Sequence, residues 1–151
     1  MSSRAIHPAP SLYDTDFLVW TAESARLLRE RRFTDIEVDN VAEEIEDLGR
    51  YQKREVESRL TLILIHLLKW TFQKPKRSRS WRSTVNTQRI ELAKVIERSP
   101  SFKSRLGAIV GDVYRDAVHL AGIQTGLDQS AFPSKCPWTS QQILDRDFWP
   151  V

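Results

Sequence analysis

Arg59 and His66 are the residues of this chain whose types and spacing come closest to a known chemistry. Arginine can hold a phosphate through two parallel hydrogen bonds, and histidine titrates near neutral pH, so the pair could bind RNA and cleave it by acid–base catalysis. Glu44 and Glu55 lie on the same helical strip as His66, because eleven residues make close to three turns. Along a straight helix, however, Glu44 and His66 stand ~33 Å apart and cannot form one site.

Six residues separate Arg59 from His66, and this spacing resembles that of the arginine–histidine motif in small helical ribonucleases of toxin systems. Leu60 departs from that motif, which favours a polar residue after the arginine. His66 also lies among leucines, in the run LTLILIHLLKW. We therefore favour a neutral core histidine that donates from one ring nitrogen to a carboxylate or a carbonyl across the bundle.

Asp112, Asp116 and His119 are the candidate metal ligands, on adjacent turns of one expected helix. Asp116 and His119 have the i, i+3 spacing of carboxylate–histidine metal sites in helix bundles. A metal site needs three or more converging ligands, and only two or three are arranged locally. We expect exposed carboxylates, no metal and no cofactor.

A basic segment with a tryptophan gives the third candidate, a nucleic-acid site. Alternating bases beside an aromatic side chain can hold a phosphate backbone and stack on a base. The alternative, which we favour, is a solvated loop beside a tryptophan that anchors the core. The candidate residues are Lys74, Lys76, Arg77, Arg79, Trp81 and Arg82.

Four helical patterns must position these residues. They run from Asp14 to about Arg32, from Val38 or Asp39 to Phe72, from Ser78 or Ser80 to about Arg98, and from Pro100 or Ser101 to about Thr125. Along the second, an apolar stripe that includes Val38, Ile45, Val56 and Leu67 predicts a core-facing side, and Gly49 allows a break. We predict an all-α bundle of four main helices with the long second helix at its centre. A C-terminal extended segment follows, with a short helix over 140–144.

Composition sets the remaining expectations. The pattern predicts a flexible N-terminal arm over residues 1–12 and a single helical domain over 13–151. No apolar run approaches the ~20 residues that cross a bilayer, and the N-terminus does not read as a secretory signal. Cys136 is the one cysteine, which agrees with a reducing cytoplasm.

Several separated motifs resemble a bacterial family, the domain-of-unknown-function family numbered twenty-nine, from Tyr13 to Phe148. The resemblance implies a small helical protein and carries no catalytic residue. It rests on Glu43-Glu44-Ile45-Glu46-Asp47-Leu48-Gly49, His66-Leu67-Leu68-Lys69-Trp70, Ser80-Trp81-Arg82, Gln88-Arg89, Phe132-Pro133 and Cys136-Pro137.

For function, the sequence favours a cytoplasmic, non-catalytic protein-interaction or accessory module. Its partner would be another protein or a second copy, because seven acids without a base lie between Asp35 and Asp47, and seven bases without an acid between Lys69 and Arg89. The alternatives are a nucleic-acid-binding protein and a metal-independent, ribonuclease-like enzyme that uses Arg59 and His66.

Overall fold

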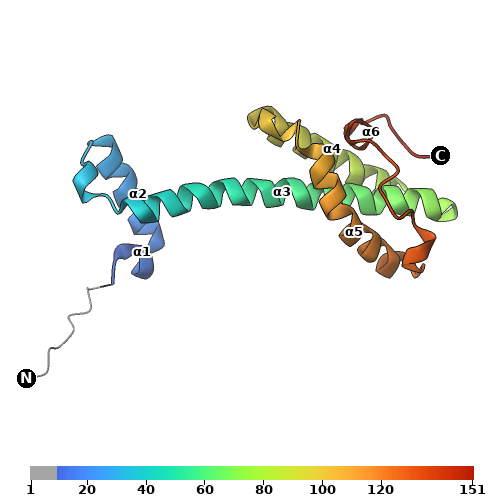
Figure 1. Cartoon of the computed structure of the whole chain (residues 1–151), viewed down its shortest axis with the longest axis horizontal. Helices are drawn as coiled ribbons and strands as arrows, with labels where there is room; N and C mark the ends of the chain where they lie inside the picture. The colour runs from blue at the N-terminus through green and yellow to red at the C-terminus, as the bar shows by residue number, and fades with distance from the viewer. Residues whose placement is uncertain (1–9) are drawn as a thin grey trace, which may run out of the picture. The chain divides into compact units, whose positions relative to one another are not determined.

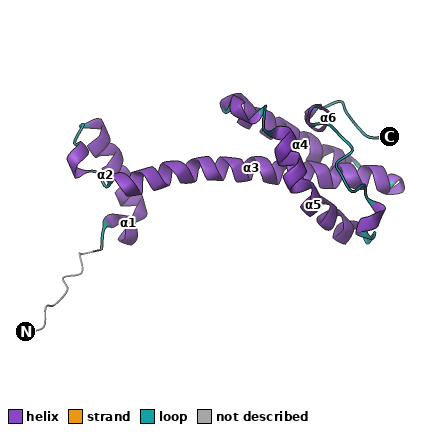
Figure 2. Ribbon diagram, in the orientation of Figure 1, coloured by secondary structure: helices purple, strands orange, loops and turns teal. Residues whose placement is uncertain are grey.

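A computed structural model describes residues 10–151, and these residues form helices and connecting loops without a strand (Figures 1 and 2). The all-α prediction is therefore confirmed. The expected N-terminal arm over 1–12 falls mostly outside the described residues. Contacts divide the chain into two compact units, residues 1–50 and residues 51–151. The single domain over 13–151 stays a prediction.

Unit 1 contains α1 (Leu12–Thr15), α2 (Phe17–Arg29), a 3₁₀ turn (Phe33–Asp35) and the first part of α3 (Val38–Phe72). The sequence predicted one helix capped by Asp14, and this was wrong. Asp16 is non-helical, and its carboxylate accepts a hydrogen bond from the Val19 amide at 3.1 Å. This cap satisfies an amide that no preceding carbonyl can reach, so a new helix begins there.

The helix α3 runs from Val38 to Phe72 through Gly49 without a break, and its residues belong to both units. One glycine costs a helix interior only about 1 kcal/mol, which neighbouring helix formers offset.

Unit 2 contains the rest of α3 with α4 (Arg79–Arg98), α5 (Leu106–Thr125) and the short α6 (Ser140–Leu144). Ser78 caps α4 by accepting a hydrogen bond from the Trp81 amide at 3.2 Å. Gly126 ends α5 in the left-handed conformation, at a φ of 73°, which glycine adopts without steric cost. Twenty-two buried residues from these helices, the 3₁₀ turn Pro100–Phe102 and the C-terminal segment make one apolar core. A bundle of four main helices stays a prediction.

The apolar stripe of α3 divides at the boundary between the units. Val56 and Leu67 are buried, as predicted. Val38 and Ile45 are 64% and 63% exposed, so the prediction that the whole stripe faces a core was wrong for its first half. Periodicity identifies an apolar side of a helix, and a second element must still cover it.

Arg89 on α4 fastens the C-terminal segment to unit 2. Its side chain is 1% exposed, and its Nε donates to the Ile143 carbonyl at 2.8 Å. Its Nη2 donates to the Phe148 carbonyl at 3.0 Å, and the ring of Trp149 lies 5.3 Å from the guanidinium carbon. The arginine thus supplies donors to carbonyls that would otherwise be buried without partners.

Candidate interaction surface

Arg59 and His66 belong to separate contacts in unit 2. Arg59 pairs with Glu55, with Nη2 and Oε1 2.8 Å apart, and donates from Nη1 to the Gln88 side chain at 2.9 Å. His66 Nδ1 lies 2.8 Å from the Leu62 carbonyl on its own helix. Within residues 10–151, no hydrogen bond or ion pair joins Arg59 to His66.

Burial lowers the pKa of His66, and the charge of Lys69 lowers it further. The imidazole is therefore neutral at pH 7. Since the Leu62 carbonyl can only accept, the ring proton lies on Nδ1. His66 is half-buried, and its partner lies four residues back on the same helix and not across the bundle as predicted. A cavity of about 360 Å³ is lined by Arg59 and Glu55, and His66 is not among its lining residues.

The metal-ligand candidates stay apart. Asp112 and Asp116 are exposed on α5, and His119 Nδ1 accepts a hydrogen bond from the Gln129 side chain at 2.9 Å. In the described part of the chain, no three His, Cys, Asp or Glu side chains are grouped closely enough to hold a metal ion.

The tryptophans near the basic segment have cations of the same chain over their rings. Lys69 Nζ lies 4.6 Å from the centre of Trp81, and the Arg77 guanidinium lies 4.7 Å from that of Trp70. Arg77 Nε also donates to the Trp70 carbonyl at 2.9 Å, which satisfies the end of α3. These cation–π contacts use ring faces that a stacked base would need.

The exposed cations of this segment remain a candidate surface for phosphate. Lys74, Lys76, Arg79 and Arg82 are exposed, and no ion pair within residues 10–151 involves them. Lys74, Lys76 and Arg79 can therefore meet an anion without first giving up an ion pair, whereas the guanidinium of Arg82 lies 5.3 Å from the ring centre of Trp149.

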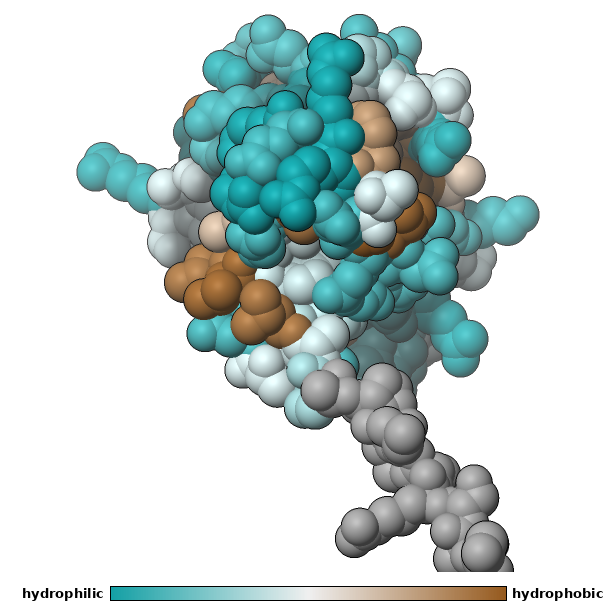
Figure 3. Space-filling model, turned by 90° about the vertical axis from the view of Figure 1, so that its left-hand side faces the viewer, coloured by the Kyte–Doolittle hydropathy of each residue, from teal (hydrophilic) through white to brown (hydrophobic). Residues whose placement is uncertain are grey.

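Unit 1 carries an apolar surface that the sequence analysis did not identify. Among its described residues, the large apolar side chains that are buried are Trp20 and Leu27. Figure 3 turns the side with α1 and α2 toward the viewer and shows brown hydrophobic groups between the teal hydrophilic ones. Nine large apolar side chains of this unit are exposed: Leu12, Phe17, Leu18, Val19, Leu28, Phe33, Val38, Ile45 and Leu48.

Part of this surface is a regular stripe on α3, made of Val38, Val41, Ile45 and Leu48, which we call the open stripe. At 100° per residue these four side chains share one side of the helix. The half-buried residues of this part of α3 are Asn40, Val41, Glu44 and Asp47. At 100° per residue, the middle of this half-buried side lies roughly a quarter of a turn from the middle of the open stripe.

Tyr13 on α1 donates to Glu44 at 2.7 Å on that neighbouring side. Glu44, by accepting this hydrogen bond, raises the pKa of Tyr13 to about 12. The α1–α2 segment therefore covers the side of α3 around Glu44 and leaves most of the open stripe uncovered.

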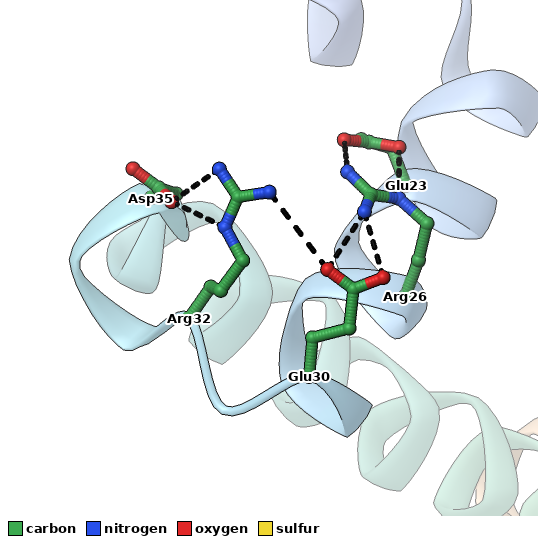
Figure 4. Close-up of polar contacts among 5 residues, drawn as sticks. All are labelled: Glu23, Arg26, Glu30, Arg32 and Asp35. Atoms are coloured by element: carbon green, nitrogen blue, oxygen red, sulfur yellow. Dashed lines mark hydrogen bonds and ion pairs between the residues drawn. The ribbon is translucent and has the colours of Figure 1, made fainter.

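The two units differ in charge. Unit 1 has six Lys and Arg against eleven Asp and Glu, a net charge of −5, whereas unit 2 has seventeen against nine, a net charge of +8. Several bases of unit 1 are already paired. Figure 4 shows Arg26 between Glu23 and Glu30, and Arg32 between Glu30 and Asp35.

Arg50 is likewise paired, with Glu43, Glu46 and Asp47. Acids flank the open stripe on both sides, with Glu37 and Glu44 on one side and Asp39 and Glu46 on the other, at 100° per residue. The surface is thus apolar along its middle and acidic along its edges.

These features define an all-helical protein with one packed unit and one unit that exposes an acid-flanked apolar surface. Residues 12–149 match the family model described as Domain of unknown function DUF29, and the chain belongs to this family. No curated protein and no solved structure matches it. In the part of the chain that the structure describes, no helix is long and apolar enough to cross a membrane.

Proposed function

We propose that this protein is a non-catalytic protein-interaction module and that unit 1 is its binding part. The observation that carries the proposal is the imbalance in the described part of unit 1, residues 10–50, where nine large apolar side chains are exposed and two are buried. Each such side chain is stabilised by roughly 1.5–3 kcal/mol when it is fully buried. Contiguous exposed apolar surface with a polar edge is typical of protein–protein interfaces.

A cytoplasmic location is part of this proposal. The single cysteine, Cys136, supports it. One thiol cannot form an internal disulfide, so the fold does not depend on an oxidising compartment.

Photo-crosslinking in cells tests the proposal. A crosslinker at Leu18, which is 79% exposed in unit 1, should give a distinct protein adduct, whereas one at Ile123 in unit 2 should not. The partner protein found in the adduct should then be purified without a crosslinker. It should bind the natural chain, and it should bind a Leu18→Asp chain at least tenfold more weakly. Equal adducts at both positions, or none at Leu18, would contradict the proposal.

Nucleic-acid binding is a second candidate, supported by the exposed cations of the basic segment that lack ion-pair partners. A fluorescent single-stranded RNA should bind more weakly as salt rises, since binding releases counterions. A Lys74→Ala, Lys76→Ala double variant should lower both the affinity and the salt dependence. RNA cleavage that disappears with His66→Ala would instead favour the ribonuclease-like alternative, which needs Arg59 and His66 to converge on a substrate.

A further inference from the structure

We infer that the open stripe of α3 binds an amphipathic helix of another protein, and that lysines or arginines flank the apolar face of this helix. The inference rests on the proposed function, because it names the chemistry of the partner that unit 1 would take.

The spacing of the open stripe indicates a helical partner. Val38, Val41, Ile45 and Leu48 follow one another at intervals of three, four and three residues, the repeat of a helix–helix seam. The stripe extends about 15 Å along the axis, enough to contact three turns of a second helix. Three of its four side chains are more than half exposed, so no element within residues 10–151 fills the seam.

The charges beside the stripe indicate the chemistry of that helix. Glu37 and Glu44 occupy the positions next to the seam that usually pair with a partner's charges. On the other edge Ala42 and Gly49 lie next to the seam, and Asp39 and Glu46 lie beyond them, with Glu46 paired to Arg50. Glu37 already accepts a hydrogen bond from Asn40, and Glu44 accepts one from Tyr13, so both carboxylates are held in place. A basic helix would complement these acids, which raises the association rate and excludes acidic competitors.

A second copy of the stripe is a poor match for the same reason. Two stripes in contact would bring Glu37 and Glu44 against each other or against the positions of Ala42 and Gly49, and none of these residues supplies a cation. The apolar groups would agree, but in the first arrangement like charges would oppose the contact, and in the second the carboxylates would meet no cation.

Peptide binding to the full chain tests the inference. The probe is a labelled 14-residue peptide with leucines at alternating three- and four-residue intervals and lysines at the flanking positions. Two comparison peptides carry glutamate in place of lysine or the same residues in scrambled order. By fluorescence anisotropy, the lysine peptide should bind at least tenfold more tightly than either, and its affinity should fall as salt rises.

Matched variants assign the binding to the stripe. Ile45→Asp should weaken binding of the lysine peptide at least tenfold, whereas Ile123→Asp should leave it unchanged, because these isoleucines are 63% and 66% exposed but lie in different units. A Glu37→Lys, Asp39→Lys double variant should lose most of the preference for lysine over glutamate. Circular dichroism should show unchanged helix content in all variants.

Three results would overturn the inference. The first is equal binding of the lysine and glutamate peptides, or binding of neither. The second is the same loss of binding from Ile123→Asp as from Ile45→Asp. The third is a dimer, seen by sedimentation, that Ile45→Asp abolishes, since this would give the stripe to a second copy. In each of these cases, crosslinking at Leu18 would still test the proposed function separately. Failure of the inference can therefore be distinguished from failure of the proposed function.

Discussion

The two units of this chain place their apolar side chains differently. In unit 2, the helices α3 to α6 and the segments between them bury twenty-two residues in one core, including side chains such as Leu64 and Leu92 that are fully inaccessible. In the described part of unit 1, α1, α2, the 3₁₀ turn at Phe33 and the beginning of α3 bury Trp20 and Leu27 and expose nine large apolar side chains. Unit 2 therefore covers its own apolar core with side chains of the same unit. Unit 1 has apolar surface suited to a second molecule.

Two tyrosines show the same contrast in their electrostatics. The pKa of Tyr13 in unit 1 is raised to about 12 chiefly by its hydrogen bond to Glu44. The pKa of Tyr114 in unit 2 is also raised to about 12, but burial is the main cause. A hydrogen bond to a carboxylate is thus the main cause of the raised pKa of Tyr13, and burial is the main cause of the raised pKa of Tyr114.

The largest effect should come from opening the core of unit 2. Leu64→Ala should lower the free energy of unfolding by about 2–5 kcal/mol, because it removes buried methyl groups and leaves a cavity. Ile45→Ala in the open stripe should change it by less than about 0.5 kcal/mol, since that side chain already meets water. Urea unfolding of both variants measures the difference. Similar losses would mean that Ile45 is covered within the chain.

A smaller loss should follow from replacing Arg89. Arg89→Met should lower the free energy of unfolding by about 2 kcal/mol, because the Ile143 and Phe148 carbonyls lose their donor. Part of the loss is offset because the natural side chain is costly to bury. Burial lowers its pKa to about 10, and its Nη1 has no hydrogen-bond partner. Amide exchange in residues 140–150 should accelerate, whereas the exposed Arg79→Met should leave it unchanged.

Acid should weaken unit 2 through His66. The folded pKa of His66 lies below its ordinary value of 6.5, because burial disfavours the charged ring. The unfolded chain therefore binds the proton first, and stability falls as the pH drops from above 6.5 toward the folded pKa. His66→Gln should flatten this part of the stability curve, measured by urea unfolding at pH 7.5, 6.5 and 5.5. An unchanged slope would contradict a neutral His66 in the folded chain.

The smallest predicted effect is a change in the pKa of one group, the phenol of Tyr13 in unit 1. Glu44→Gln should lower the pKa of Tyr13 from about 12 toward its ordinary value of 10, since it removes the carboxylate that accepts the phenolic hydrogen bond. Ultraviolet difference titration against a Tyr13→Phe chain isolates this group. Tyr114 should be unaffected, and a parallel shift there would indicate that unfolding had displaced both tyrosines.

Most of the helices were predictable from local signals. The helix from Val38 to Phe72, the Ser78 cap, the end of α5 at Gly126 and the short helix over 140–144 all follow from caps and periodicity. The break at Asp16 was missed because Asp14 and Asp16 are equally good caps by residue type. Only the surrounding contacts decide between them.

The candidate sites were harder to predict because they depend on long-range contacts. Periodicity could not show that Val38 and Ile45 lack a covering element, since that depends on which side of α3 meets Tyr13. In the sequence, Arg89 is the last of the seven bases that begin at Lys69, and its residue type does not distinguish it from the other arginines. In the structure it is the most buried charged residue described. An arginine beside apolar residues at helical spacing could have signalled this role, but its carbonyl partners lie more than fifty residues away.

The way in which Arg89 holds the C-terminal segment also affects how that segment can vary. The arginine recognises backbone carbonyls, which every residue type possesses, so the exposed residues Arg146 and Asp147 are not specified by this contact, whereas the charge of Asp145 acts on Arg89. Substitutions at Arg146 and Asp147 can accumulate without releasing the segment. They are therefore suitable positions for a reporter group or an affinity handle that leaves the fold of unit 2 undisturbed.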